Sequence, residues 1–243
     1  MAKPDVTLRV PASCRPRMED QRQRALSESV EEYVEGIYRL QREVDRVSTG
    51  EIAVYMQVSP GSASSMVKRL AEMDLVEHTP YYGIRLTAFG EKVAKQLTRA
   101  HRILERFLVD DLGLPWNDVH ELACKLEHYL SEDVIDRIDA KMGHPKTCPH
   151  GNPVDADAPD PSVRLEAAPA GLLTVFRISD ERVEFLRRLE ELNLRPGVTF
   201  NATGSTAVDQ LIHIEVQGQR HTVGHEVARH VWVVPAENSE QNP

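Results

Sequence analysis

The chain has 243 residues, 41% of them hydrophobic and 28% charged, so it can bury one or two hydrophobic cores and lacks the composition of a disordered chain. It has no run of 18 apolar residues, no hydrophobic N-terminal segment and only three cysteines without CxxC spacing, which argues against a membrane span, a secretory signal and a disulfide framework and indicates the cytoplasm. Residues 1–95 carry 14 basic and 14 acidic residues, so the net charge of −9 belongs to residues 96–243 and the first part can still meet DNA phosphates.

A helix is predicted from Ser27 to about Glu43, after a polar, proline-containing tail. Apolar residues recur along it at helical spacing. Ser29 followed three residues later by Glu32 matches a capping box, which would place Glu32 at position N3 of the helix. Glu35 lies one turn further along, so the helix presents two carboxylates with either a structural or a ligand-binding role.

The next elements follow the order of a winged helix-turn-helix. Residues 48–51 open a short helix, residues 58–61 form a turn, and a second helix begins at Ser62. Two short strands are predicted over residues 75–78 and 84–87. A hairpin directly after the second helix is a wing, so this part of the chain is predicted to bind DNA.

Two longer helices are predicted beyond the wing. The first runs from Thr87 to Gly113 and the second from Trp116 to about Met142, each with apolar residues at helical spacing. A minimal DNA-binding module does not need them. A second copy of the chain is the most economical cover for their apolar stripes, so we expect a homodimer.

The last part of the chain is predicted to be a small β-rich domain. A linker rich in Pro, Asp and Ala precedes it, and alternating strands with one helix suggest a short SH3-like barrel. The expected fold class is mainly α with a small β part. The expected segments, in chain order, are a flexible tail (1–26), a winged helix-turn-helix domain (27–95), a helical domain (96–145), a linker (146–169), an SH3-like domain (170–236) and a second tail (237–243).

Metal-ligating side chains gather on one face of the second long helix. At about 100° per residue, His120, Cys124, Glu127 and His128 fall within about 100° of one another, away from the apolar residues. Two imidazoles, a thiolate and a carboxylate form a donor set that transition metals bind well. A solvated polar face that contains two histidines by chance is the alternative.

A second candidate group lies on the preceding helix, where His101 and Glu105 are four residues apart beside the apolar stripe. Such groups on consecutive helices could face each other across a metal ion. A solvated His–Glu pair is the simpler alternative for this helix alone, just as a capping role is the alternative for Glu32.

Two further histidine groups carry weaker signals. His144, Cys148 and His150 could bind zinc, but they fall in the predicted linker, where no element would orient them. The histidines of the β-rich part are more simply explained as strand and turn residues; they are His213, His221, His225 and His230. No glycine-rich nucleotide motif, GxSxG or HExxH motif occurs, so the common enzyme signatures are absent.

In combination, these motifs resemble those of the diphtheria toxin repressor (DtxR/MntR) family of iron- and manganese-dependent regulators. The matching segments are residues 32–38, 58–60, 101–105, 120–128 and 150–153. The resemblance covers residues 27–153 closely and the C-terminal domain more loosely. It implies a homodimer in which residues 96–145 dimerise and bind metal, with a FeoA-like domain over residues 170–236.

The resemblance also implies two metal sites per chain. The primary site would bridge the first helix and the dimerisation helices, with the ligands Glu32, Cys124, Glu127 and His128, joined by Glu35. Three residues match the ancillary site, namely His101, Glu105 and His120. Members with three domains complete that site from the SH3-like domain, for which the candidates are Asp180, Glu181 and Glu184.

The ligand types match neither branch of the family fully. Glu32 is typical of manganese sensors, whereas Cys124 is the ligand of iron sensors. Hard carboxylates favour Mn²⁺ and a thiolate favours softer ions. We expect Mn²⁺, because Glu32 and Glu35 add two hard donors against one sulfur, and Fe²⁺ is the alternative.

The function that the resemblance implies is a repressor of genes for metal uptake and homeostasis, not an enzyme. Its predicted partner is double-stranded operator DNA. Residues at the start of the recognition helix are expected to reach base edges, namely Ser59, Pro60, Ser62 and Ser65, and phosphates are expected to contact Lys68, Arg69 and Arg85. A metal-dependent hydrolase and a metal-independent winged-helix regulator are the rival interpretations.

Overall fold

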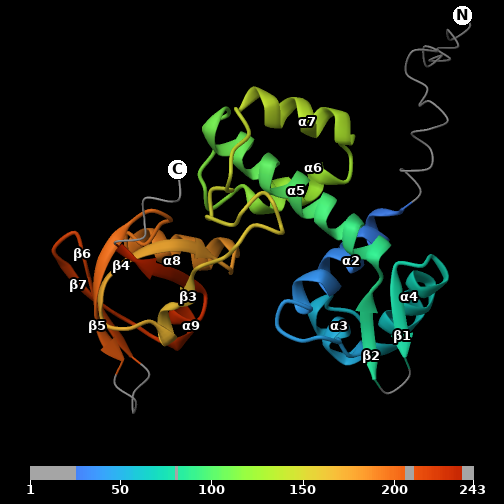
Figure 1. Ribbon diagram of the computed structural model, residues 1–243, viewed down its shortest axis with the longest axis horizontal. Coiled ribbons are helices and arrows are strands. Elements are labelled where there is room, and N and C mark those ends of the chain that lie inside the picture. The colour runs from blue at the N-terminus through green and yellow to red at the C-terminus, as the bar shows by residue number, and fades with distance from the viewer. Residues whose placement is uncertain (1–25, 80–81, 206–210, 237–243) are drawn as a thin grey trace, which may run out of the picture. The chain divides into compact units, whose positions relative to one another are not determined.

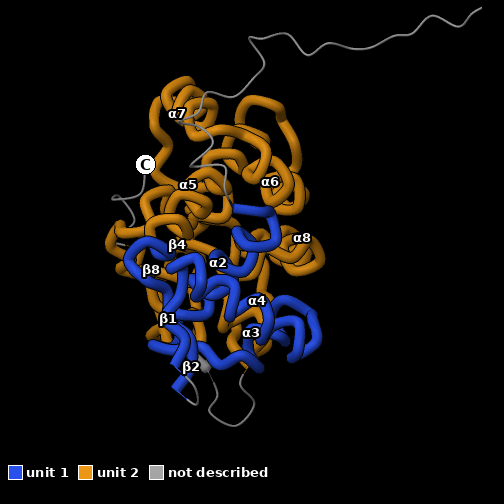
Figure 2. The backbone as a smooth tube through the Cα atoms, turned by 90° about the vertical axis from the view of Figure 1, so that its right-hand side faces the viewer, with its two compact units in different colours: residues 1–91 blue, residues 92–243 orange. Residues whose placement is uncertain are grey.

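The computed structural model describes residues 26–79, 82–205 and 211–236. Cys14, nearly all of the predicted N-terminal tail and the predicted C-terminal tail lie outside these ranges. The chain divides into two compact units, residues 1–91 and residues 92–243 (Figure 2). Within the described ranges, no helix is long and apolar enough to cross a membrane.

The first unit has the predicted order of a winged helix-turn-helix (Figure 1). Its described elements are α2 (Glu28–Leu40), α3 (Thr49–Tyr55), α4 (Pro60–Glu72), β1 (Val76–Thr79) and β2 (Gly83–Leu86). The two strands pair antiparallel as a wing. Leu70 of α4 and Ile84 of β2 are fully buried, so the helices and the hairpin share one hydrophobic core.

The start of the first helix differs from the prediction. Helix α2 begins at Glu28, and Ser27 is its N-cap residue. The capping box predicted at Ser29 is therefore wrong, because Ser29 and Glu32 both lie inside the helix. Glu32 has no capping role, and its side chain is exposed.

Side-chain caps fix the starts of both helices in the helix-turn-helix. The Ser48 hydroxyl accepts a hydrogen bond from the Glu51 N–H, and the Glu51 carboxylate accepts one from the Ser48 N–H. Ser59 caps α4 in a similar way, with Pro60 in the first turn. Helix α4 therefore starts two residues before the predicted Ser62.

Helix α5 (Ala88–Asp110) leads into the second unit, where α6 (His120–Glu127) and α7 (Glu132–Lys141) follow. The single helix predicted from Trp116 to Met142 is therefore wrong. Ser131 takes an extended backbone conformation, with φ −74° and ψ 155°, and becomes the N-cap residue of α7. The chain consequently turns between α6 and α7.

The apolar stripes of these helices pack mainly against each other. Ile103 of α5 shares one core with Ala123 of α6 and Ile135 of α7. Much of the apolar surface that was expected to need a second copy is thus covered within the chain. Leu122 and Tyr129 are apolar or aromatic side chains of this unit that stay exposed.

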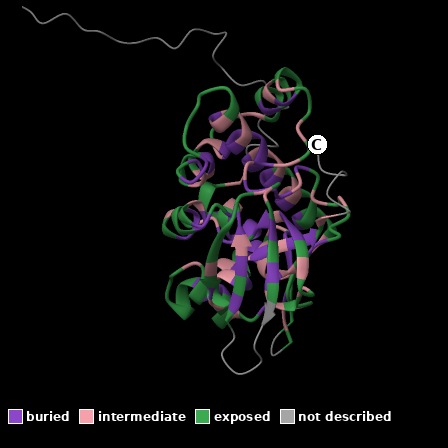
Figure 3. Ribbon diagram, turned by 90° about the vertical axis from the view of Figure 1, so that its left-hand side faces the viewer, coloured by how far each residue is buried: buried purple, intermediate pink, exposed green. Residues whose placement is uncertain are grey.

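The C-terminal part of the second unit is the predicted β-rich domain. Its elements are β3 (Val163–Arg164), the 3₁₀ helix η2 (Leu165–Ala167), β4 (Gly171–Ile178), α8 (Val183–Glu191), β5 (Thr199–Ser205), β6 (Ile212–Val216), β7 (Gln219–Val223), α9 (His225–Ala228) and β8 (Val231–Pro235). The strands form a strongly curved sheet in the order β3-β8-β4-β5-β6-β7 (Figure 1). Buried and exposed residues alternate along strands such as β6, so one face of the sheet lines the core (Figure 3).

Part of residues 146–169, predicted as a linker, is firmly packed. Cys148 and His150 have no exposed surface. Gly151 approaches strand β4 so closely that a Cβ atom there would lie 2.2 Å from the Phe176 carbonyl oxygen. The composition suggested a flexible segment, but buried side chains and backbone contacts with β4 hold it in place.

Candidate metal centre

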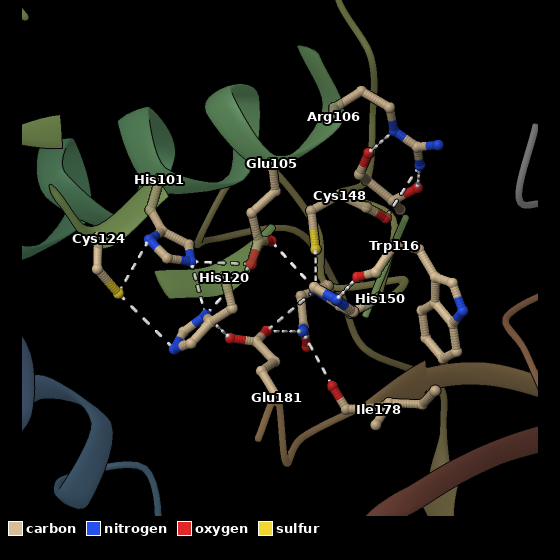
Figure 4. Close-up of polar contacts among 12 residues, drawn as sticks. His101, Glu105, Arg106, Trp116, His120, Cys124, Cys148, His150, Ile178 and Glu181 are labelled. Atoms are coloured by element: carbon tan, nitrogen blue, oxygen red, sulfur yellow. Dashed lines mark hydrogen bonds and ion pairs between the residues drawn. The ribbon is translucent and has the colours of Figure 1, made fainter. Parts of the chain in front are cut away.

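Helices α5 and α6 carry the first part of the site. His101 and Glu105 lie four residues apart in α5, so their side chains leave the same face of the helix. His120, Cys124 and Glu127 share a face of α6 by the same spacing. The structure brings the two faces together around the His101 imidazole, which is only 2% exposed (Figure 4).

Four donors meet between these helices and the β-rich domain. His101 Nε2 lies 3.0 Å from Glu105 Oε1 and 3.1 Å from His120 Nδ1. His120 Nδ1 in turn lies 3.3 Å from Glu105 Oε1 and 2.9 Å from Glu181 Oε2. One ligand atom from each of these four residues lies within 4.8 Å of all the others. Segments distant in the sequence thus converge on one buried point.

Of the three acidic candidates in the β-rich domain, Glu181 is the one that reaches this cluster. The Asn152 side-chain amide donates to Glu181 Oε1 at 2.8 Å and holds the carboxylate in place. Asp180 pairs instead with Arg182, whose Nη2 lies 2.5 Å from Asp180 Oδ2. Glu184 is exposed in the first turn of α8.

The site extends to two residues of the predicted linker. His150 Nδ1 lies 3.2 Å from Glu105 Oε2, and Cys148 Sγ lies 3.8 Å from His150 Nδ1 (Figure 4). With Glu181, they form a second group of four donors whose ligand atoms lie within 4.8 Å of one another. The expectation that nothing would orient them is wrong, because His150 Nε2 donates to the Trp116 carbonyl oxygen at 2.8 Å. Their close spacing was the only signal in the sequence.

His144, the third residue of the zinc group considered from the sequence, does not join this cluster. It is exposed, and its Nδ1 lies 3.1 Å from Asp139 Oδ2. A further group in the β-rich domain combines His230 with Asp180 and Glu226. The Arg182 guanidinium contacts both of these carboxylates and already supplies a positive charge there.

The other edge of the His101 ring faces three residues predicted for the primary site. His101 Nδ1 lies 2.8 Å from Glu127 Oε2 and 3.9 Å from Cys124 Sγ. His128 Nε2 lies 3.6 Å from Glu127 Oε1. Cys124, Glu127 and His128 are therefore neighbours at the end of α6, and His101 lies between them and the other donors.

The two remaining residues predicted for the primary site belong to α2 in the first unit. Glu32 is exposed, whereas Glu35, one turn later, is 7% exposed. The Arg39 guanidinium donates to Glu35 Oε1 at 2.8 Å. The joining of these two carboxylates to the α6 residues stays a prediction.

Burial and pairing set the protonation of the histidines. Burial by itself lowers the pKa of His101, but Glu105 and the hydrogen bonds of the ring outweigh it and hold that pKa well above its ordinary value. Burial also lowers the pKa of His120, and hydrogen bonds with Cys124, Glu105 and Glu181 overcome it and raise the pKa to about 12. A cation that binds these imidazoles must therefore displace protons.

The same contacts act on the acidic groups in the opposite direction. Burial raises the pKa of Glu105, but the imidazoles around it hold that pKa well below its ordinary value. For Glu181, burial and the nearby Glu105 raise the pKa, and hydrogen bonding to His120 helps to lower it to about 2. Burial raises the pKa of the Cys148 thiol. Both carboxylates are thus ionised at neutral pH.

The donor set fits a divalent transition metal. Imidazole nitrogens suit Mn²⁺, Fe²⁺ and Zn²⁺ ions, carboxylate oxygens suit the harder of these, and a thiolate suits the softer ones. Metal–ligand distances of about 2.0–2.3 Å require that the ligand atoms lie within about 4.6 Å of one another. Each group of four donors comes close to this condition before any adjustment.

The predicted DNA contacts lie on α4 and on the wing. The seven residues are all exposed, namely Ser59, Pro60, Ser62, Ser65, Lys68, Arg69 and Arg85. Local bonds already engage the serines: the Ser59 and Ser62 hydroxyls lie 2.9 Å apart, and the Ser65 hydroxyl donates to the Gly61 carbonyl oxygen. Direct contacts of these residues with DNA stay a prediction.

Three family models match consecutive parts of the chain. Residues 25–84 match the iron dependent repressor, N-terminal DNA binding domain. Residues 87–155 match the iron dependent repressor, metal binding and dimerisation domain. Residues 164–235 match the FeoA domain. This is the order of domains that the family resemblance implied.

Individual relatives cover nearly the whole chain. The iron-dependent repressor IdeR of Mycobacterium leprae is 32% identical over 225 residues, which cover 86% of this chain and 97% of that protein. A solved structure of a manganese-dependent transcriptional repressor in complex with manganese has a TM-score of 0.78 and 33% identity, over 85% of this chain and 99% of the other. The structure of ScaR with bound Zn²⁺ has a TM-score of 0.76 and 31% identity, over 85% and 99% of the two chains. The chain therefore belongs to the DtxR/MntR family of iron- and manganese-dependent repressors.

Proposed function

We propose that this protein is a metal-dependent transcriptional repressor, activated by Mn²⁺ or Fe²⁺, that controls genes for metal uptake and homeostasis. The single observation that carries the proposal is the buried cluster of His101, Glu105, His120 and Glu181 in a chain that also has a winged helix-turn-helix. Clusters of buried, strongly paired ionisable groups are typical of functional sites. The names of the relatives, IdeR and a manganese-dependent repressor, agree with this function.

The proposed ligands fall into two sites. The ancillary site takes His101, Glu105, His120 and Glu181. The primary site takes Cys124, Glu127 and His128 from α6, and the family resemblance adds Glu32 and Glu35 from α2. Glu181 replaces the less defined choice among Asp180, Glu181 and Glu184, because its carboxylate lies 2.9 Å from His120.

Mn²⁺ is the preferred ion of the proposal, and Fe²⁺ is the alternative. In the ancillary site, all four donors are nitrogen or oxygen, a set that both ions accept. In the primary site, one sulfur of Cys124 stands against the carboxylates of Glu32, Glu35 and Glu127. The iron-dependent and manganese-dependent relatives leave both ions open.

A link from metal to DNA lies within the first unit. A groove there is lined by Glu32 and Tyr33 of α2 and, on the other side, by Ser59, Ser62 and Arg69 at and after the start of α4. A bound divalent cation supplies positive charge that offsets the proposed carboxylate ligands. Glu32 thereby fixes α2, and α2 in turn limits where the start of α4 can lie. In a dimer, this sets the separation of two recognition helices to match two half-sites on DNA.

Operator DNA and a second copy of the chain are the proposed partners. Small side chains at the start of α4 would read thymine methyl groups and DNA shape, because arginine, asparagine and glutamine are absent from its first turn. Lys68, Arg69 and Arg85 would contact phosphates. The dimer would use the domain that matches the metal binding and dimerisation model, where Leu122 and Tyr129 are exposed.

The test is the binding of the purified chain to its own upstream DNA by anaerobic fluorescence anisotropy, with chelator and then with titrated Mn²⁺ or Fe²⁺. We expect binding only with metal. Glu127→Gln should abolish this response, whereas Glu121→Gln, an exposed control on the same helix, should retain it. Equal binding in chelator would remove the sensor function, and normal activation of Glu127→Gln would overturn the primary-site assignment.

A further inference from the structure

Two groups of four donors in the second unit share the carboxylates of Glu105 and Glu181. On one side of these carboxylates lie His101 and His120, here named the histidine side. On the other lie Cys148 and His150, here named the cysteine side. We propose that the two sides form one dinuclear centre, in which Glu105 and Glu181 bridge two divalent metal ions; this inference rests on the proposed function.

The Glu105 carboxylate presents one oxygen to each side (Figure 4). Its Oε1 lies 3.0 Å from His101 Nε2 and 3.3 Å from His120 Nδ1. Its Oε2 lies 3.2 Å from His150 Nδ1. A carboxylate that uses a single ion would not need nitrogen partners on both oxygens, whereas a bridging carboxylate does.

The Glu181 carboxylate repeats this arrangement from the β-rich domain. Its Oε2 lies 2.9 Å from His120 Nδ1, and its Oε1 lies 3.7 Å from His150 Nδ1. Asn152 donates to Oε1 at 2.8 Å and to the Ile178 carbonyl oxygen at 3.0 Å, so the carboxylate has a fixed orientation. Two carboxylates with opposed oxygens can hold two ions about 3.5–4 Å apart, a common spacing in two-metal sites.

Hydrogen bonds on the far side of two rings aim their free nitrogens at the centre. The Trp116 carbonyl oxygen can only accept, so His150 carries its proton on Nε2 and turns the Nδ1 lone pair toward Glu105. Glu127 acts in the same way on His101 Nδ1, at 2.8 Å, and leaves Nε2 directed at the centre. Metal-ligating histidines are oriented by such partners.

A single ion cannot use all six donors. Ligand atoms of one ion must lie within about 4.6 Å of one another. The six donors instead separate into two groups of four, each containing both carboxylates. One ion would leave two buried donors of the other side without a cation, namely Cys148 and His150 or His101 and His120, whereas two ions use all six.

The charges and the donor types agree with two ions. Two divalent cations bring four positive charges, and Glu105, Glu181 and an ionised Cys148 bring three negative ones, so the buried centre is close to neutral. The histidine side offers only nitrogen and oxygen, which suits Mn²⁺ or Fe²⁺. The cysteine side adds sulfur, which favours the softer Fe²⁺, Co²⁺ or Zn²⁺.

The experiment counts ions in the full chain with the primary site disabled by Cys124→Ser and His128→Ala. Equilibrium dialysis against Co²⁺ should give two ions per chain, with a sulfur-to-cobalt charge-transfer band from Cys148. Adding Cys148→Ser should remove the band and lower the count to one. Adding His120→Gln should also lower the count to one but retain the band, so the two variants serve as controls for each other.

Electron paramagnetic resonance of the Mn²⁺-loaded background chain tests the bridge without any change inside the centre. Two bridged Mn²⁺ ions should give a spin-coupled spectrum with half the ordinary hyperfine spacing. One uncoupled ion, with a count that Cys148→Ser does not change, would overturn the dinuclear centre; metal-dependent DNA binding by the wild type would then still support the proposed function. Wild-type protein that binds no metal would overturn both. Circular dichroism melts verify that each variant is folded.

Discussion

His101 occupies the most connected position in the centre, because its two ring nitrogens face different sets of residues. Nε2 faces Glu105 and His120, and Nδ1 faces Glu127. A change of proton or cation on one nitrogen alters the acidity of the other, so this ring links the residues proposed for the primary and the ancillary site.

The raised pKa values of His101 and His120 predict how metal affinity depends on pH. Both rings hold protons through neutral pH, and a metal ion must displace them. Affinity for Mn²⁺ should therefore rise between about pH 6 and pH 8, by about tenfold per pH unit for each proton released. Isothermal titration calorimetry in buffers of different ionisation enthalpy measures that number. His120→Gln should lower the slope, and an affinity independent of pH would contradict the protonated state.

Gly151 predicts a local weak point that can be measured against a matched glycine. Gly151 and Gly197 both have left-handed φ values, +82° and +84°, but only a Cβ at Gly151 meets the backbone of β4. Alanine costs about 1–2 kcal/mol at either position because of the left-handed backbone. Gly151→Ala should lose about 1–3 kcal/mol more, as overpacked sites do. Equal losses for the two variants in urea unfolding would refute the close approach.

At the scale of elements, the ends of the helices decide where ligands lie. The break between α6 and α7 leaves His128 at the C-terminal cap of α6 and lets Glu127 turn toward His101. Hydrophobic periodicity continues across this break, so the sequence predicted one helix. The break depends on the backbone conformation at Ser131, which periodicity does not report.

The caps of α2 and α3 provide a direct comparison. Ser48 makes both bonds of a capping box with Glu51, whereas Ser27 makes no side-chain bond to α2. Ser48→Ala should therefore lower the free energy of unfolding by about 1 kcal/mol, and Ser27→Ala by much less. Thermal unfolding of the two variants tests this difference, and a larger effect at Ser27 would show that the caps have been misassigned.

At the scale of the whole molecule, repression requires that metal and DNA act on one dimer. Lys68 is exposed on α4, where we expect it to neutralise a phosphate. Lys68→Ala should weaken binding to all DNA sequences and lower the slope of log affinity against log salt by about one. Lys125→Ala, an exposed change on α6, is the control. A loss confined to one DNA sequence would indicate base readout by Lys68 instead.

The sequence by itself determined the order of the elements, the winged helix-turn-helix, the β-rich domain and the donors of α5 and α6. Those features follow from local patterns, because helical spacing puts His101 beside Glu105 and His120 beside Cys124 on the same faces. The tertiary structure decided that Glu181, not Asp180 or Glu184, completes the cluster, since neighbouring residues after a strand point in different directions. It also brought in Cys148 and His150. Their position depends on contacts with Trp116 and with strand β4, which lie far away in the sequence and have no local signature.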